Sequence, residues 1–271
     1  MFILFGAVLA FALWAWGEPV WREWRRLQWR RRLFPPAWRE VLRRRVPQVH
    51  RMPADLQLQL KRHIQVFLAE KVFIGCRGLV VTEEMRVTIA AQACMLLLNR
   101  RRPRYFPNLR QILVYPGAFL VDRVHTDAAG IAQDRRQALS GESWSQGQVI
   151  LSWEDTLAGA AVPDDGHNVV IHEFAHQLDQ ENGQANGAPL LPRQADRVRW
   201  SAVMGAAFEQ LRRQVQCGEE ALLNAYGATD PAEFFAVASE VFFEQPESLA
   251  RSHPPLYEVL SGFYRLNPLS W

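Results

Sequence analysis

Cysteine is scarce in this chain: its 271 residues include only Cys76, Cys94 and Cys217. Three thiols so widely spaced exclude a disulfide framework and a cysteine-based zinc site, and they are typical of a reducing compartment. The chain also lacks internal repeats and low-complexity segments. With 49% hydrophobic and 22% charged residues, it is neither disordered, nor collagen-like, nor a multi-span membrane protein, and it can bury a sizeable core.

Charge is missing from residues 1–17, and a strongly basic stretch follows them. Residues 22–51 contain eleven arginines and only two acidic residues. As a helix, residues 1–17 reach about 26 Å and residues 1–21 about 31 Å, which is the low edge of what spans a bilayer. Because the arginines follow the apolar run, the rest of the chain should face the cytoplasm. The sequence thus predicts a membrane anchor over residues 1–21, a basic linker over residues 22–51 and a globular domain over residues 52–271, tethered to the inner face of the cytoplasmic membrane.

Two other interpretations of residues 1–21 remain open. The segment could form a peripheral or buried helix, or it could be a cleaved signal peptide. A signal peptide, however, carries its basic residues before the apolar run. The arginines suit nucleic acid as well, but no DNA- or RNA-binding motif accompanies them, so no direct nucleic-acid binding is expected. Contact with anionic lipid head groups of the inner membrane is the simpler expectation.

Apolar spacing and helix-capping residues predict a predominantly helical domain. The expected helices cover residues 37–45, 55–70, 82–98, 164–179, 194–216, 230–244 and 254–265. Two strands are expected within residues 108–121, and a third over residues 148–153. Strands and helices do not alternate regularly, so the predicted class is α+β with a small mixed sheet rather than a parallel βαβ sheet.

The most informative segment is VVIHEFAHQLD, which contains an H-E-x-x-H motif at His172, Glu173 and His176. On a helix, residues four apart share a face, so both histidines can bind one metal ion, while Glu173, rotated by about 100°, can approach a water molecule there. A third ligand must come from elsewhere, because a catalytic zinc has three protein ligands. His167 lies on the expected helix but about 140° away, and Asp179 is expected to hold an imidazole or to close the helix. The alternative is a helix with two hydrogen-bonded histidines and no metal.

The expected helix over residues 230–244 supplies the candidates for the third ligand. Asp230 and Glu233 form a helix-capping pattern, which explains Glu233 without any metal. Glu240 and Glu244 lie within about 20° of the same helix face. A buried carboxylate needs a partner, so at least one of the three glutamates should be paired or bound to metal. Spacing alone does not choose among them.

Together with YGATDPAEFFAVASEVFFEQP, the H-E-x-x-H segment resembles the Mlc titration factor A family of bacterial zinc metallopeptidases, from about residue 50 to the C-terminus. The resemblance implies a zincin-like fold similar to the catalytic domain of anthrax lethal factor, with zinc bound by His172, His176 and Glu233. It also implies that Glu173 is the general base and that Tyr226, seven residues before Glu233, assists catalysis. The familiar enterobacterial members of that family bind the repressor Mlc and remove it from DNA, which derepresses a sugar-uptake gene. An Mlc-like transcriptional repressor is therefore an expected partner.

Sequence and resemblance together predict a zinc-dependent peptidase. Zinc and Glu173 would activate a water molecule, and zinc and Tyr226 would stabilise the oxyanion of the tetrahedral intermediate. Residues 148–153 are expected to form the edge strand that holds an extended peptide. Two alternatives remain, namely a repressor-binding protein whose peptidase activity is latent or secondary, and a membrane-tethered scaffold without metal.

Overall fold

The computed structural model describes residues 2–126, 132–139, 141–144 and 147–271, with side chains in residues 17–118 and 147–271. Its helices are α1 (Phe2–Arg31), α2 (Pro36–Arg45), α3 (Gln48–Arg51), α4 (Ala54–Glu70), α5 (Glu83–Met95), α6 (Trp153–Ala161), α7 (Val169–Asp179), α8 (Gln194–Cys217), α9 (Pro231–Glu244), α10 (Pro246–Ser252) and α11 (Pro254–Tyr264). Short 3₁₀ helices cover Gln180–Asn182, Ala225–Ala228 and Pro268–Ser270. The strands are β1 (Val72–Gly75), β2 (Gln111–Tyr115), β3 (Phe119–Thr126), β4 (Ala132–Leu139), β5 (Gly141–Trp144) and β6 (Gln148–Ser152).

The main sheet has the strand order β1-β2-β6-β5, and β3 pairs with β4 in a separate antiparallel ribbon. In the main sheet, Val72 lies opposite Gln111, and Gln111 lies opposite Gln148, so β1, β2 and β6 run parallel; β5 is antiparallel to β6. The predominance of helices and the small mixed sheet confirm the α+β class. The parallel part is a correction, because α5 forms a crossover between β1 and β2 that the irregular order of elements did not indicate.

Strand β1 is not among the strands that the sequence predicted. Its residues are alternately exposed and half-buried, so it lacks the buried positions that mark a strand in a sequence. Gly75 ends the strand at a close backbone approach, where an added Cβ would lie 1.8 Å from the carbonyl oxygen of Leu79. Glycine is therefore required at the end of this strand, because any side chain there would collide with the backbone of Leu79.

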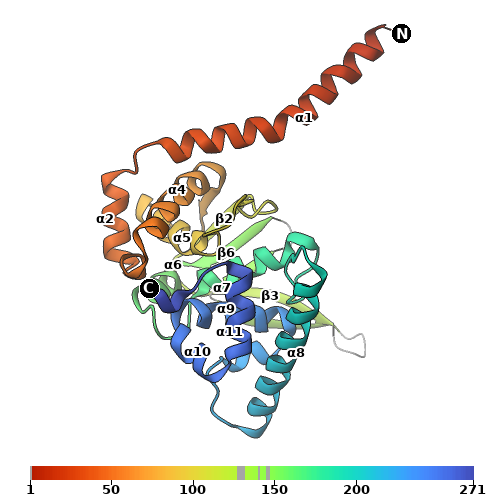
Figure 1. Ribbon diagram of the computed structural model, residues 1–271. Coiled ribbons are helices and arrows are strands. Elements are labelled where there is room, and N and C mark those ends of the chain that lie inside the picture. Colours follow the sequence, from red (N-terminus) through yellow and green to blue (C-terminus); the bar gives the residue numbers. More distant parts are fainter. Residues whose placement is uncertain (1, 127–131, 140, 145–146) are drawn as a thin grey trace.

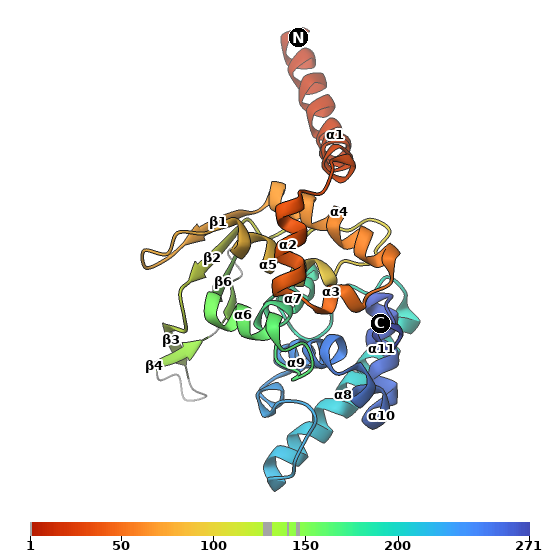
Figure 2. The same ribbon diagram turned by 90° about the vertical axis from the view of Figure 1, so that its left-hand side faces the viewer.

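Helix α5 is deeply enclosed in the core. Every residue from 87 to 95 is buried, and the helix contacts α4, α2, α6 and α7. A helix that is apolar all round is stable only with neighbours on several sides. Figure 2 shows the strands on one side of the molecule and α8, α10 and α11 on the other, with α7 between them. Helix α7 contacts β5 and β6 as well as α9, so it lies between the sheet and the C-terminal helices.

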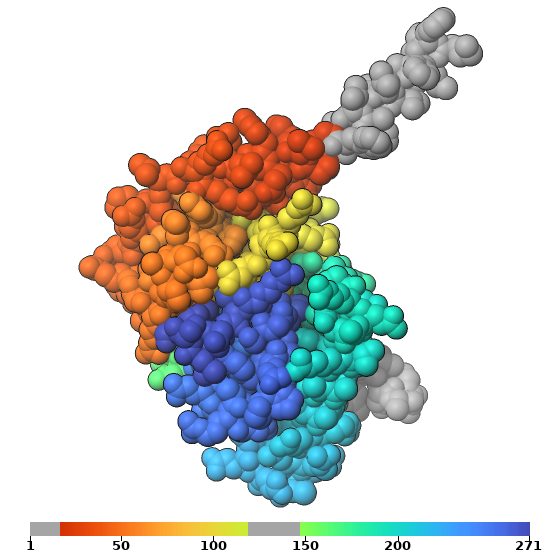
Figure 3. All heavy atoms as spheres, viewed as in Figure 1, coloured from red at the N-terminus to blue at the C-terminus, as the bar shows by residue number. Residues whose placement is uncertain are grey.

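The C-terminal part of α1 packs on α4, as Figures 1 and 3 show for the residues from 17 onward. Arg26 binds Glu70 through two hydrogen bonds, of 2.6 Å from Nε and 2.9 Å from Nη2. Within the described part of the chain, no helix is long and apolar enough to cross a membrane. The anchor expected over residues 1–21 falls mainly on residues 1–16, whose side chains lie outside that part.

Candidate metal centre

Helix α7 begins at Val169, directly after Asn168, whose side-chain oxygen accepts a hydrogen bond from the N–H of Ile171 at 3.0 Å. Asparagine at this position is among the most effective helix N-caps. The helix is therefore shorter than the sequence predicted, and His167 precedes it instead of lying on it. A cavity of about 760 Å³ borders the polar side of the helix.

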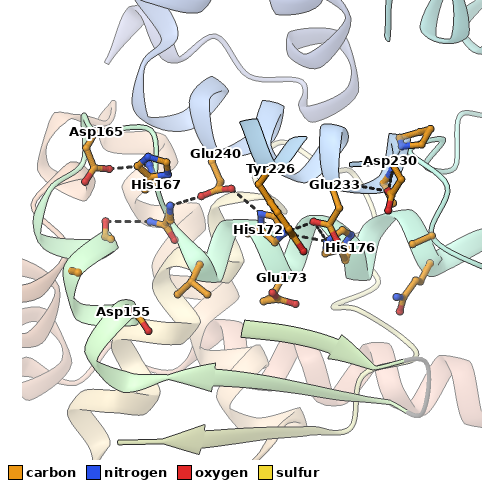
Figure 4. A pocket seen from close by; sticks show the side chains of 18 of the residues that line it. Asp155, Asp165, His167, His172, Glu173, His176, Tyr226, Asp230, Glu233 and Glu240 are labelled. Atoms are coloured by element: carbon orange, nitrogen blue, oxygen red, sulfur yellow. Dashed lines mark hydrogen bonds and ion pairs between the residues drawn. The ribbon is translucent and has the colours of Figure 1, made fainter. Parts of the chain in front are cut away.

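Three side chains converge in this cavity (Figure 4). Nε2 of His172 lies 3.2 Å from Nε2 of His176 and 3.0 Å from Oε2 of Glu233. The remaining distance, from Nε2 of His176 to Oε2 of Glu233, is 3.4 Å. Tetrahedral ligands at zinc bond lengths of about 2.0–2.1 Å lie about 3.3–3.4 Å from one another. The three atoms thus lie close to three corners of a tetrahedron that fits a zinc ion.

Glu233 reaches the histidines from the first turn of α9. The N-cap of that helix is Asp230, whose Oδ1 accepts hydrogen bonds from the N–H groups of Ala232 at 2.8 Å and Glu233 at 3.0 Å. Figure 4 shows the carboxylate of Glu233 turned toward His172 and His176. The capping interpretation therefore explains Asp230, but it does not explain where the side chain of Glu233 lies.

Glu240, seven residues further along α9, contacts the opposite edge of the same imidazole. Its Oε1 lies 2.7 Å from Nδ1 of His172, and its Oε2 accepts a hydrogen bond from the N–H of Asn168 at 2.5 Å. A carboxylate on Nδ1 favours the proton on that nitrogen and directs Nε2 toward the centre. Glu240 thus lies behind His172, on the side away from Glu233.

Glu244 is one step further from the centre. Its Oε1 accepts a hydrogen bond of 2.9 Å from the side-chain amide of Asn168, and burial raises the pKa of this carboxyl to about 8. A carboxyl that is protonated near neutral pH is a poor metal ligand. Asn168 is hydrogen-bonded to Ile171, Glu240 and Glu244 and so links α7 to α9, a role that the sequence analysis missed. An asparagine directly before an apolar run is a typical helix N-cap and could have drawn attention to this residue.

Hydrogen bonds between the imidazoles and the carboxylates shift the pKa values of His172 and Glu233. Burial by itself would lower the pKa of His172, but hydrogen bonds to Glu233 and Glu240 outweigh it and raise this pKa well above its usual value. Burial would raise the pKa of Glu233, but hydrogen bonds with His172 and His176 outweigh it and lower this pKa. The same geometry that holds a proton between imidazole and carboxylate suits a metal cation, which takes the place of the proton.

The two other predicted site residues line the same cavity. Glu173 is only 4% exposed, and Figure 4 shows its carboxyl group on the side of α7 nearer the strands. Tyr226 is 40% exposed and approaches from the 3₁₀ helix before α9, with its ring centre 6.1 Å from that of His172. The structure therefore brings His172, Glu173, His176, Tyr226 and Glu233 to one place.

Of two expectations around the site, one is confirmed and one needs correction. Asp179 is the last residue of α7, which is the second of its two expected roles, and its Oδ2 accepts hydrogen bonds of 2.7 Å from the N–H groups of Asn186 and Gly187, so it fixes the loop after α7. Residues 148–153 were expected to form the edge strand, but β6 lies between β2 and β5. The strand at the sheet edge that contacts α7 is β5.

Comparison with known proteins identifies the family. The model of the glucose-regulated metallo-peptidase M90 family matches residues 21–265. An uncharacterized protein of Synechocystis sp. is 40% identical over 98% of this chain and 97% of its own length. Mlc titration factor A is 38% identical in Serratia proteamaculans, over 75% of this chain and 77% of that protein, and 34% identical in Escherichia fergusonii, over 86% of this chain and 87% of that protein. With its converging histidines and glutamate, the chain therefore belongs to the glucose-regulated metallo-peptidase M90 family.

Proposed function

We propose that this chain is a zinc-dependent peptidase whose ion is bound by His172, His176 and Glu233. The observation that carries the proposal is the spacing of the three ligand atoms, which lie 3.0–3.4 Å apart at the wall of a large cavity. Two imidazoles and a carboxylate are a frequent ligand set of catalytic zinc and leave a fourth position open. When bound, zinc would supply a Lewis acid that polarises the peptide carbonyl.

The remaining groups handle protons, charge and substrate position. Glu173 accepts the proton of the attacking water molecule and delivers it to the amine that leaves. The Tyr226 hydroxyl donates a hydrogen bond to the oxygen on which negative charge develops. An extended peptide pairs with the outer edge of β5 and so passes along α7.

Metal analysis of the purified full chain tests this proposal. We expect one zinc ion per chain and hydrolysis of a mixture of quenched fluorogenic peptides. His176→Ala should lose both properties, whereas His50→Ala, which changes an exposed histidine of α3, should lose neither. A wild-type chain without zinc, or His176→Ala protein with full zinc content, would contradict the proposal.

Replacing Tyr226 by phenylalanine should lower kcat by about 10²–10³-fold, because it removes one hydrogen bond made mainly in the transition state. Zinc content and thermal stability should barely change, since the ring and all three proposed ligands remain. Steady-state kinetics with a peptide substrate measures the effect. Near-wild-type turnover of the Tyr226→Phe variant would exclude a catalytic role of the hydroxyl and leave Tyr226 as a half-exposed ring that only packs against its neighbours.

Glu240→Gln should weaken zinc binding by about 10–100-fold, the range for residues that orient a ligand imidazole. The glutamine amide has no negative charge to stabilise the proton on Nδ1 of His172. Its NH₂ group is a hydrogen-bond donor and cannot accept that proton's hydrogen bond. Competition with a fluorescent chelator measures the affinity, and Glu220→Gln, at an exposed position after α8, is the matched control. Equal affinities in the two variants would show that Glu240 only supports the packing of α9.

The names of the relatives favour a second function. Several of the similar proteins are called Mlc titration factor A, and on this basis we extend binding of an Mlc-like transcriptional repressor to this chain. The Glu173→Gln variant separates the two functions, because it should no longer hydrolyse peptides but should still bind the repressor. If no repressor of this type from the same genome binds the purified chain, the second function is wrong.

The location of the chain rests on its first residues. We propose that residues 1–21 hold it at the inner face of the cytoplasmic membrane, because an uncharged run precedes eleven arginines. A reporter at the C-terminus should be active in the cytoplasm and should sediment with membranes. Deleting residues 1–21 should release it, and sedimentation that survives the deletion would overturn the assignment.

A further inference from the structure

A second cavity, of about 370 Å³, lies where α1 meets α4 and the segment before β2, and it shares no lining residue with the metal centre. Cations dominate its wall: the basic side chains are Arg22, Arg25, Arg26, Lys71 and Arg104. The acidic ones are Glu18 and Glu70. Two tryptophans and a tyrosine complete the polar and aromatic part of the lining. The cavity therefore combines positive charge with aromatic surface.

One wall of this cavity is rigid. The guanidinium of Arg26 is held by both oxygens of Glu70 and lies 4.8 Å from the ring centre of Tyr105. The hydroxyl of Tyr105 accepts hydrogen bonds from Arg30, of 3.3 Å from Nε and 3.2 Å from Nη2, and lies 2.8 Å from Nδ1 of His63. These bonds join α1, α4 and the segment before β2, so this part of the cavity wall is held together by contacts between separate elements of the fold.

One basic residue of the cavity lining, Lys71, is buried. Lys71 is 7% exposed, and its Nζ donates to the carbonyl oxygens of Phe106 at 2.8 Å and Leu109 at 2.7 Å. An ammonium has three N–H donors, so these two bonds do not use its full capacity. Burial lowers the pKa of Lys71 to about 8.

The mouth of the cavity lies close to the uncharged run in the sequence. Trp21 and Arg25 are exposed there, and the guanidinium of Arg25 lies 4.6 Å from the Trp21 ring centre. Along a helix, Trp21 is about 6 Å beyond Gly17, where the run ends. The polar zone of a bilayer leaflet is about 5–8 Å thick beyond the hydrocarbon. With the uncharged run in the bilayer, as proposed above for residues 1–21, Trp21 and Arg25 lie at the depth of the head groups.

We propose that the cavity between α1 and α4 binds the phosphate-bearing head group of an anionic phospholipid. Guanidinium forks pair well with phosphate oxygens, and the ring of Trp21 suits the boundary between acyl chains and head groups. The site is independent of the peptidase proposal, because no residue of the metal centre takes part. Its occupancy would fix the chain on the membrane in one orientation.

The full chain in a neutral detergent, titrated by calorimetry with short-chain phosphatidylglycerol, tests this proposal. We expect saturable binding that short-chain phosphatidylcholine does not reproduce. The double variant Arg25→Gln/Arg104→Gln should bind about 30-fold more weakly, since each basic residue near an anionic surface contributes about fivefold. The control pair Arg39→Gln/Arg213→Gln removes the same charge at exposed positions of α2 and α8, and it should bind like the wild type.

Four outcomes would overturn the proposal. Equal affinity for phosphatidylglycerol and phosphatidylcholine would show that the anionic head group is not recognised. An equal loss of affinity in the two double variants would show only a diffuse attraction between the basic protein and the anionic lipid. If inorganic phosphate binds as tightly as the lipid does, the cavity is a site for a free anion and not for a lipid head group. A short DNA oligonucleotide that displaces the lipid at equal concentration would assign it to nucleic acid. Unchanged circular dichroism and melting temperature in both double variants verify that they are folded.

Discussion

Replacing Glu173 by glutamine is expected to reduce peptide hydrolysis by about 10²–10⁴-fold while zinc content stays at the wild-type level. Glutamine has nearly the same shape, which matters for a side chain that is only 4% exposed, but it cannot accept the proton of an attacking water molecule. His172 and His176 remain in place, so the metal site is not dismantled. The measurements are kcat/KM with quenched peptides and zinc content by atomic absorption.

Glu154→Gln is the matched control for this variant, since it makes the same change at an exposed glutamate of α6. The loss in Glu173→Gln should appear in kcat with KM nearly unchanged, because proton transfer is needed in the transition state and not for binding. Activity within tenfold of the wild type would exclude Glu173 as the general base. Loss of zinc along with activity would mean that Glu173 supports the metal site instead.

Glu233→Ala should weaken zinc binding by more than about 100-fold, because removing a ligand costs more than removing a residue that only orients one, about 10–100-fold. Hydrolysis should fall with it. The helix-capping interpretation predicts something different, namely a loss of about 0.5–2 kcal/mol in the free energy of unfolding with zinc binding unchanged. Chelator competition and chemical denaturation together separate the two.

The structure supplies a control with the opposite pattern. Asp230→Ala removes the side chain that accepts the N–H groups of Ala232 and Glu233, but it leaves all three proposed ligands. It should therefore lower the free energy of unfolding by about 0.5–2 kcal/mol and change zinc affinity little. Stoichiometric zinc in folded Glu233→Ala protein, or equal zinc loss in Asp230→Ala, would remove Glu233 from the ligand set.

Local features of the site could be predicted from the sequence, and relations between helices could not. The pairing of His172 with His176 follows from helix geometry alone, because four residues make about one turn. The choice among Glu233, Glu240 and Glu244 did not follow, since all three lie on one face of α9. Seven residues of helix advance by about 10 Å, so Glu233 and Glu240 meet opposite edges of His172. Only the packing of α9 on α7 fixes which edge each one meets.

The sheet shows the same limit. The strand over residues 148–153 was recognised from its composition, yet its place in the sheet depends on which strands flank it. β5 takes the edge position and pairs antiparallel with β6, and neighbour order of this kind is a tertiary property that leaves no mark on the strand itself. Likewise β1 is too short and too exposed to produce a periodic pattern.

The proposed ligands come from two helices, and His172 and Glu233 are 61 residues apart in the chain. An ion bound between them would cross-link α7 to α9 and close a loop that contains the whole of α8. Such a link restricts the unfolded chain, and the gain rises only slowly with loop length. Helix α8 has 24 residues, of which Trp200, Met204 and Leu211 are buried, and it contacts α9 and α11. An ion between α7 and α9 would therefore hold both ends of the segment that carries α8 and so add to the packing that already fixes it.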